Sequence, residues 1–329
     1  MAKMNMVQAL NLALKQEMQK DDSVIVLGED VGRDGGVFRV TDQLIDVYGE
    51  DRVVDTPLAE SAIAGMSVGM AVYGLKPVCE IQFSGFSYES FHQIENHAAR
   101  IRWRSNGRFH VPMVLRAPYG GGVRALEHHS ESREAYWAHT PGIKMVIPSG
   151  PRIARALLVS AIRDPDPVIF YEAKSLYRAF REEVPEEEET MEIGKSRIVR
   201  EGNDLTMISY GAMMRPTMEA AAELSEKHGL EAEVIDLLTI YPLDDELFTG
   251  SVKKTGKAVV VHEAPMSFGA GAEIVSRIVE KSFYYLEAPV ARVTGFDIII
   301  PLFAREKDYI PDANRIVRSV QEMWEKMYN

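Results

Sequence analysis

The sequence predicts an α/β protein of two domains, each a parallel β-sheet covered by helices on both faces. Two observations support this prediction. Short β-rich segments alternate with stretches of helical periodicity, the pattern of parallel strands joined by crossover helices. The β-rich segments are apolar throughout rather than alternately apolar and polar, as strands covered on both faces require. Both sheets are therefore expected to lie inside three-layer domains.

The first domain is predicted over residues 1–185. Residues 62–75 are its most apolar stretch, but they are too short and too rich in glycine to cross a bilayer. We expect them to form a buried helix. The predicted strands of this domain are residues 24–27, 78–83, 113–115, 145–147 and 168–170.

An acidic segment separates the two domains. Residues 181–192 read Arg-Glu-Glu-Val-Pro-Glu-Glu-Glu-Glu-Thr-Met-Glu, and the mutual repulsion of these carboxylates disfavours a compact core element. We therefore place a linker at residues 186–203 and a second domain at residues 204–329. Its predicted strands are residues 205–209, 234–236 and 258–261, and its predicted helices are residues 215–228, 271–283 and 312–328.

The composition of the chain narrows its function. With 329 residues, a net charge of -12 and a pI near 5.3, the chain repels phosphate, which disfavours binding to nucleic acid or anionic membranes. The single Cys79 has no partner for an internal disulfide, and the first residues lack the pattern of a signal peptide. We expect a cytoplasmic protein without a membrane anchor that binds small molecules and other proteins.

The most informative segment is Asp-Thr-Pro-Leu-Ala-Glu-Ser at residues 55–61, which follows a β-rich segment and opens a helix rich in small residues. Glu60 thus lies where a strand gives way to a helix. Taken alone, an acidic residue there complements the positive end of the helix dipole. The capping-box spacing Thr-x-x-Glu would need glutamate at position 59, where the chain has Ala59. Glu60 is therefore a candidate for a second role.

Several segments together resemble the beta subunits of thiamine-diphosphate-dependent 2-oxo acid dehydrogenases. They are residues 27–32 (Leu-Gly-Glu-Asp-Val-Gly), 55–61, 80–83 (Glu-Ile-Gln-Phe), 128–130 (His-His-Ser), 138–144 (Ala-His-Thr-Pro-Gly-Ile-Lys), 241–244 and 261–263, in the family's order over nearly the whole chain. The resemblance implies an N-terminal thiamine pyrimidine-binding domain and a C-terminal transketolase-like domain. It also implies oxidative decarboxylation of a 2-oxo acid, with acyl transfer to the lipoyl group of an acyltransferase core.

The resemblance assigns four residues to the cofactor site. Glu60 matches the carboxyl group that favours the imino tautomer of the aminopyrimidine. Gln82 and Phe86 match residues that contact this ring, and Leu58 lines the same pocket. Phe86 can stack a flat apolar face on the ring, although a core position is the default for a lone aromatic residue. Some relatives with branched-chain substrates carry tyrosine in place of Gln82.

A second candidate is the pair His128 and His129, which follows three glycines at residues 120–122. Glycine-containing loops after strand ends often face ligands in open α/β sheets. The resemblance implies that His129 is the catalytic-site histidine, which stabilises charge or manages a proton during acyl transfer. We interpret His128 as an exposed neighbour. Metal binding by adjacent histidines is disfavoured because their side chains diverge.

Residues 161–167, Ala-Ile-Arg-Asp-Pro-Asp-Pro, have a solvated turn as their default interpretation. The resemblance implies a monovalent cation here, usually K+, bound mainly by carbonyl oxygens and one carboxylate. Only Asp164 contributes a side-chain chemistry that the sequence can check. The ligands carried over from the family are Val111, Met113, Val114, Ala161, Asp164 and Asp166.

One expected motif is missing. The diphosphate of thiamine diphosphate needs a divalent metal, whose familiar carrier is a Gly-Asp-Gly segment, and this chain contains none. The resemblance therefore implies that an alpha subunit holds Mg2+ and the diphosphate. The active site is expected at the interface of an α2β2 heterotetramer.

Three other interpretations stay open: a noncatalytic partner-binding α/β protein, an acetoin dehydrogenase beta subunit and a transketolase split into two chains. A nicotinamide enzyme is disfavoured because no Gly-x-Gly-x-x-Gly opens a helix after a strand. The substrate is open between pyruvate and branched-chain 2-oxo acids such as 3-methyl-2-oxobutanoate. Residues 136–139 look slightly more like branched-chain relatives, whereas residues 176–181 fit both, so the sequence leans to a branched-chain substrate.

Overall fold

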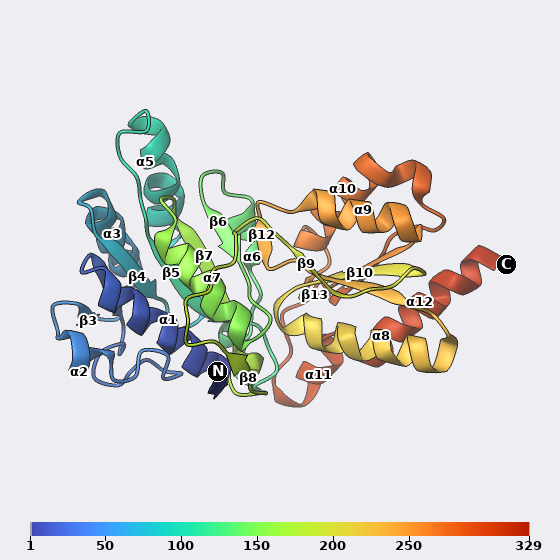
Figure 1. Ribbon diagram of the computed structural model, residues 1–329, viewed down its shortest axis with the longest axis horizontal. Helices are drawn as coiled ribbons and strands as arrows, with labels where there is room; N and C mark the ends of the chain where they lie inside the picture. The colour runs from blue at the N-terminus through green and yellow to red at the C-terminus, as the bar shows by residue number, and fades with distance from the viewer. Residues whose placement is uncertain (1, 329) are drawn as a thin grey trace.

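The computed structural model describes residues 2–328, which form the two lobes seen in Figure 1. The elements of the N-terminal part are β1 (Ala2–Met4), α1 (Met6–Lys20), β2 (Val24–Gly28), α2 (Leu44–Tyr48), β3 (Val53–Asp55), α3 (Glu60–Val72), β4 (Lys76–Glu80), η1 (Ser84–Phe86), α4 (Phe91–Gln93), η2 (Ile94–Ala98), α5 (Ala99–Arg104), β5 (Val114–Tyr119), η3 (Glu127–His129), α6 (Glu134–Ala138), β6 (Lys144–Val146), α7 (Pro151–Arg163), β7 (Val168–Ala173), η4 (Lys174–Leu176) and β8 (Glu182–Val184).

The elements of the C-terminal part are β9 (Arg197–Arg200), β10 (Leu205–Ser209), η5 (Gly211–Met213), α8 (Met214–His228), β11 (Ala232–Asp236), β12 (Thr239–Tyr241), α9 (Asp245–Thr255), β13 (Ala258–Pro265), α10 (Ala270–Ser282), η6 (Phe283–Tyr285), β14 (Ala291–Gly295), η7 (Phe303–Arg305), α11 (Glu306–Tyr309) and α12 (Ala313–Tyr328). Both parts confirm the predicted α/β class.

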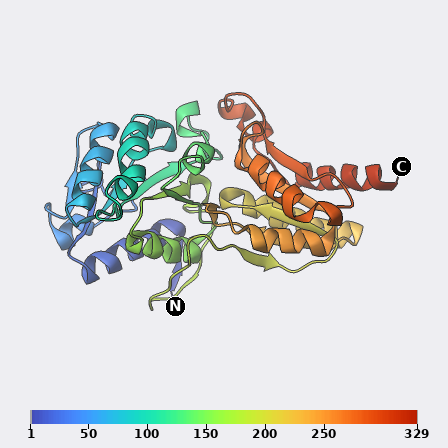
Figure 2. The same ribbon diagram turned by 90° about the horizontal axis from the view of Figure 1, so that it is seen from above.

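The first sheet has the strand order β12-β6-β7-β5-β4-β2-β3, and all its strands are parallel except β12. Figure 2 shows α1 and α7 on one face of this sheet and α3 with the α4 to α5 segment on the other. The strands β2, β5 and β7 are buried at every residue, as their continuous apolar character predicts. The first domain is therefore a three-layer structure.

The second sheet has the order β14-β13-β10-β11-β9, with only β9 antiparallel. In Figure 1, α9 and α10 lie on one face of it and α8 and α12 on the other. Strand β12 comes after the predicted linker, yet it is the edge strand of the first sheet, where Thr239 pairs with Val146. The chain thus returns to the first sheet before it completes the second, and the domain boundaries given above stay a prediction.

The helix predicted at residues 62–75 is α3, and it is buried on one face only. Ile63 and Ala64 are almost fully buried, whereas Met66 is 42% exposed and Tyr73, which follows the helix, is 90% exposed. The prediction of a buried helix was wrong for this second face. Its apolar composition does not show by itself which residues a single sheet can cover.

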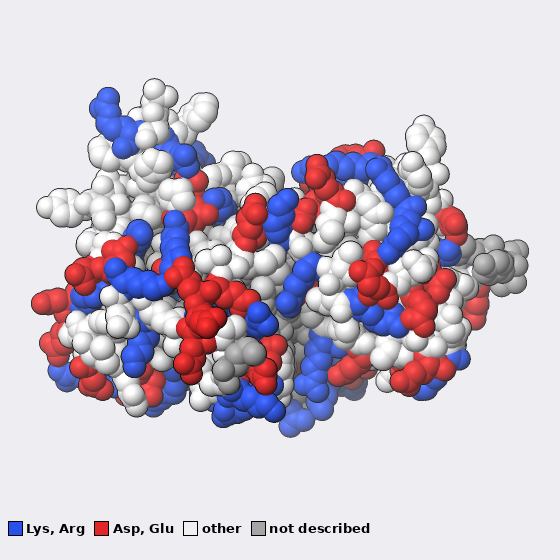
Figure 3. Space-filling model, viewed as in Figure 1, with Lys and Arg blue, Asp and Glu red and all other residues white. Residues whose placement is uncertain are grey.

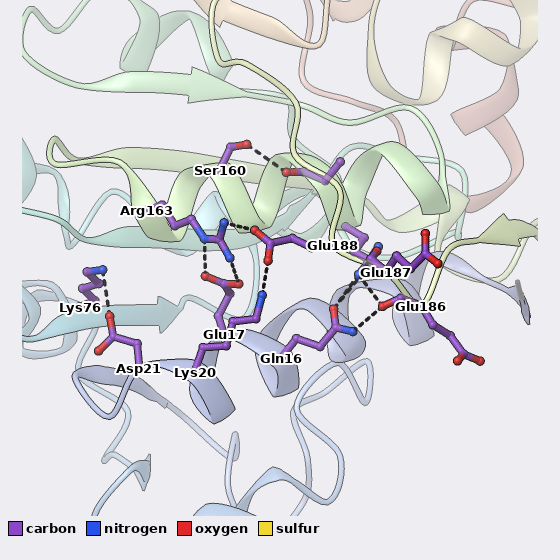
Figure 4. A network of polar contacts seen from close by, with 12 residues as sticks. Gln16, Glu17, Lys20, Asp21, Lys76, Ser160, Arg163, Glu186, Glu187 and Glu188 are labelled. Carbon is purple, nitrogen blue, oxygen red and sulfur yellow. Dashed lines mark hydrogen bonds and ion pairs between the residues drawn. The ribbon is translucent and has the colours of Figure 1, made fainter.

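The acidic segment after β8 lies along α1 and α7, as Figure 4 shows. Arg163 of α7 pairs with Glu17 at 2.6 Å and also with Glu188, which pairs in turn with Lys20. Acidic and basic side chains accordingly lie next to each other on this face in Figure 3. Basic residues of the two helices therefore offset the carboxylate repulsion expected from the sequence.

No helix within residues 2–328 has both the length and the apolar character to cross a membrane.

Candidate active site

The residues predicted for the cofactor site lie along one edge of the first sheet. Glu60 opens α3 after β3, Gln82 follows β4, and His129 lies in the connection after β5. Parallel strands end at the same edge of a sheet, and ligands of open α/β proteins bind at this carboxyl edge. The fold therefore brings three residues that are far apart in the sequence to one edge.

Glu60 belongs to a group of carboxylates at this edge. Burial raises the pKa of Glu29, and the nearby charges of Asp30 and Glu60 raise it further. Gln82 donates a hydrogen bond from Nε2 to Oδ2 of Asp30 at 3.2 Å. These groups suit a ligand that donates hydrogen bonds or carries positive charge. Sequence reasoning missed Glu29 and Asp30 as site residues, although they directly follow Gly28, the last residue of β2.

Phe86 packs against His129 in a small aromatic cluster. The two ring centroids lie 5.1 Å apart in an edge-to-face arrangement, and Phe83 lies 4.3 Å from the same imidazole. Gly85 permits this contact, because a Cβ atom there would lie 1.9 Å from the carbonyl oxygen of His128. A side chain at position 85 would push η1 away from η3, which carries His129. Phe86 is partly buried and packs against the hydrophobic core as well as against His129.

The surroundings of His129 lower its pKa. Burial lowers its pKa, and the positive charges of Lys174 and His128 lower it further, so the ring is neutral near pH 7. Its Nδ1 atom is buried and has no hydrogen-bond partner among the described residues. A buried polar atom without a partner is costly, so the position of this ring depends on the contacts that surround it. The exposed His128 lies outside this cluster, with Nδ1 3.9 Å from Oε2 of Glu131.

Leu58 lies two residues before Glu60. Its side chain is 71% exposed, so the rest of the chain covers it only in part. The described residues thus place a carboxylate, an amide, an aromatic ring and an imidazole near one edge of the sheet. This donor and acceptor set fits an aminopyrimidine ring.

The predicted cation turn is already neutralised by protein side chains. Lys144 donates from Nζ to both carboxylate oxygens of Asp164, at 2.8 and 2.6 Å, and Arg102 donates to both oxygens of Asp166. The carbonyl of Met113 accepts a bond from the backbone N–H of Val168 at 2.9 Å. The two aspartates therefore do not fit as free cation ligands. Sequence reasoning missed Lys144, which lies twenty residues before Asp164.

A buried group of ion pairs links three neighbouring strands of the first sheet. Arg116 of β5 donates to Glu80 at 2.7 Å and to both oxygens of Glu172 at 2.7 and 2.9 Å. Tyr177 adds a hydrogen bond to Glu172 at 2.7 Å. Burial raises the pKa of Glu80, whereas the guanidinium of Arg116 lowers it. This group joins β4, β5 and β7, and its Glu80 lies two residues before Gln82.

The fold and this edge define a protein of the transketolase class. The chain matches the family model "Transketolase, pyrimidine binding domain" at residues 2–179 and the model "Transketolase, C-terminal domain" at residues 194–316. A solved structure described as "Split gene transketolase, inactive beta4 tetramer" shares the fold, with a TM-score of 0.81 and 23% identity over 98% of each chain.

Relatives with a higher sequence identity identify the family within this class. The chain is 50% identical to the "Pyruvate dehydrogenase E1 component subunit beta" of Acholeplasma laidlawii over 98% of both chains. It is also 50% identical to the protein of the same name from Staphylococcus aureus strain Mu50, over 99% of this chain and 100% of that one. The chain belongs to the family of beta subunits of thiamine-diphosphate-dependent 2-oxo acid dehydrogenases.

Proposed function

We propose that this chain provides the aminopyrimidine half of a thiamine diphosphate site that an alpha subunit completes. The observation that carries the proposal is the Glu60 side chain at the start of α3, close enough to Glu29 to raise its pKa. Thiamine diphosphate, when bound, supplies the nucleophile and electron sink for decarboxylation of a 2-oxo acid. In this proposal Glu60 holds a proton at the ring, and the surrounding residues orient that ring.

The other contacts follow from the same arrangement. The amide of Gln82, which donates to Asp30, hydrogen-bonds the ring, and Phe86 packs against it. Leu58 lines the same pocket. The neutral imidazole of His129 accepts or donates a proton while the acyl group passes to the lipoyl group of an acyltransferase.

An alpha subunit is the partner that this half-site requires. The relatives are named as beta subunits of an E1 component, and the chain has no Gly-Asp-Gly segment for a diphosphate-bound metal. We assign Mg2+ and the diphosphate to the alpha subunit of an α2β2 heterotetramer.

K+ at residues 161–166 would have to rely on carbonyl oxygens, since Lys144 and Arg102 engage Asp164 and Asp166. Thermal unfolding in KCl against matched NaCl would reveal such a site as a K+-specific rise in the midpoint.

We propose pyruvate as the substrate. The relatives at 50% identity are named for pyruvate dehydrogenase, and this outweighs the slight lean of residues 136–139 toward branched-chain relatives. Pyruvate and 3-methyl-2-oxobutanoate differ by two carbon atoms, and a pocket discriminates by only about 10- to 200-fold for each methylene, so both acids need testing.

The test is decarboxylation by this chain coexpressed with its alpha subunit, against each chain alone, with Mg2+ and thiamine diphosphate. We expect turnover only with both chains, and a higher kcat/KM for pyruvate than for 3-methyl-2-oxobutanoate. The reverse order of substrates would restore the branched-chain assignment. Turnover of acetoin alone would favour the acetoin alternative, and no turnover with a verified partner would contradict the proposal.

A further inference from the structure

The loop that carries His129, residues 120–133, connects β5 to α6 and depends on tertiary contacts for its shape. Gly120 and Gly122 have positive φ values of 80° and 90°, and Arg124 has φ 58°, which is uncommon for a residue with a side chain. A cavity of about 500 Å3 lies between residues 130–133 and residues 297–300, so this side of the loop is only partly packed. Such a backbone persists only where its surroundings hold it.

Glu306, in the C-terminal domain, binds the first half of this loop. It is the first residue of α11 and is 2% exposed. Its Oε1 accepts a hydrogen bond from the N–H of Gly122 at 2.9 Å, and its Oε2 accepts one from the N–H of Arg124 at 3.1 Å. Hydrogen bonds to an ionised acceptor are stronger than those between neutral groups. One carboxylate therefore fixes two of the three positions in this loop that have a positive φ.

Glu263, also in the C-terminal domain, joins the two ends of the loop. Its Oε1 accepts a hydrogen bond from the N–H of Gly121 at 3.2 Å and one from the hydroxyl of Ser132 at 2.6 Å. A Cβ atom at position 120 would lie 2.1 Å from the same oxygen, so only glycine fits there. This single oxygen atom of Glu263 therefore links the two ends of the loop that contains His129.

Lys174 connects these carboxylates to His129 itself. Its buried Nζ donates to the carbonyl oxygens of Gly120 and His129. Burial lowers the pKa of Lys174, and the charges of Glu263 and Glu306 partly offset this effect, which leaves the pKa at about 8. Two acidic residues of one domain thus stabilise the ammonium group that holds the backbone of His129 in the other domain.

We propose that Glu306 and Glu263 are positioning residues for His129, so that the C-terminal domain sets the geometry of the catalytic loop. The proposal rests on the acyl-transfer role of His129 proposed above. It gives the C-terminal domain a function in the reaction. The alternative is that the two carboxylates only hold the domains together.

The test uses Glu306→Gln in the complex with the alpha subunit. An amide cannot accept from both N–H groups with its two end atoms, because its nitrogen is itself a donor. We expect hydrogen exchange of residues 120–132 to become about 10- to 100-fold faster, from the loss of one or two charge-assisted bonds. We also expect kcat with a lipoyl acceptor to fall at least about tenfold, with KM for the 2-oxo acid little changed.

Ser149→Ala is the matched control, because it removes an interdomain hydrogen bond, to Asp236, that involves no residue of the loop. It should leave both readouts unchanged. If Glu306→Gln does not fold, Glu306→Asp keeps the charge on a shorter side chain and should give smaller effects in the same direction. Unchanged exchange in residues 120–132, or faster exchange with unchanged kcat, would overturn the positioning role. His129→Gln with wild-type acyl transfer would instead refute the role proposed for His129.

Discussion

Glu60→Gln is expected to lower turnover of the complex with the alpha subunit by about 100- to 10,000-fold, the usual range for a lost acid or base. A glutamine side chain has nearly the same shape but cannot hold or release the proton. Glu60 is only half-buried, so stability should change by less than about 1 kcal/mol, the effect of one charge at a helix terminus. Steady-state decarboxylation and thermal unfolding of the same preparation measure the two quantities.

Glu246→Gln is the control for this substitution. Glu246 also lies in the first turn of a helix, α9, and is exposed far from the carboxyl edge of the first sheet. If Glu60 only complemented its helix dipole, both variants would keep full turnover. Loss of turnover in Glu60→Gln alone would separate the catalytic role from the helix-terminus role.

Arg116→Ala is expected to destabilise the chain by about 3–5 kcal/mol, because it leaves Glu80 and Glu172 buried without their cation. Glu80 already has a raised pKa through burial, and without the guanidinium it would rise further. Urea unfolding at pH 7 measures the loss. Since a protonated carboxyl is less costly to bury, the loss should shrink as the pH falls.

The matched substitution is Arg102→Ala. Arg102 is about half exposed, and its ion pair with Asp166 should contribute only about 0–1 kcal/mol. Comparable destabilisation at the two positions would mean that burial of the Arg116 group does not dominate its energetics. Little effect at Arg116 would mean that the two carboxylates find other partners or are neutral.

The sequence predicted those features of the site that follow from strand order. Continuous apolar segments predict parallel strands, and residues that follow such strands come to one edge, which places Glu60, Gln82 and His129 together. The exposed face of α3 and the pairing of β12 with β6 could not be predicted in this way, because periodicity does not say which surface covers an element.

The residues that hold the site in place from a distance could not be predicted for the same reason. Glu306 binds a residue 184 positions earlier in the chain, and no local pattern signals a contact of that separation. Lys144 and Asp164 illustrate a second limit. Two oppositely charged residues on neighbouring segments can satisfy each other, so an acidic turn in a sequence does not by itself predict a cation site.

The most direct test is calorimetric titration of thiamine diphosphate with Mg2+ into this chain, into the alpha subunit and into their complex. We expect tight binding only to the complex, weakened when Glu60 is replaced by glutamine. Tight binding to this chain alone, or binding to the complex that Glu60→Gln leaves unchanged, would contradict a cofactor site divided between the two subunits.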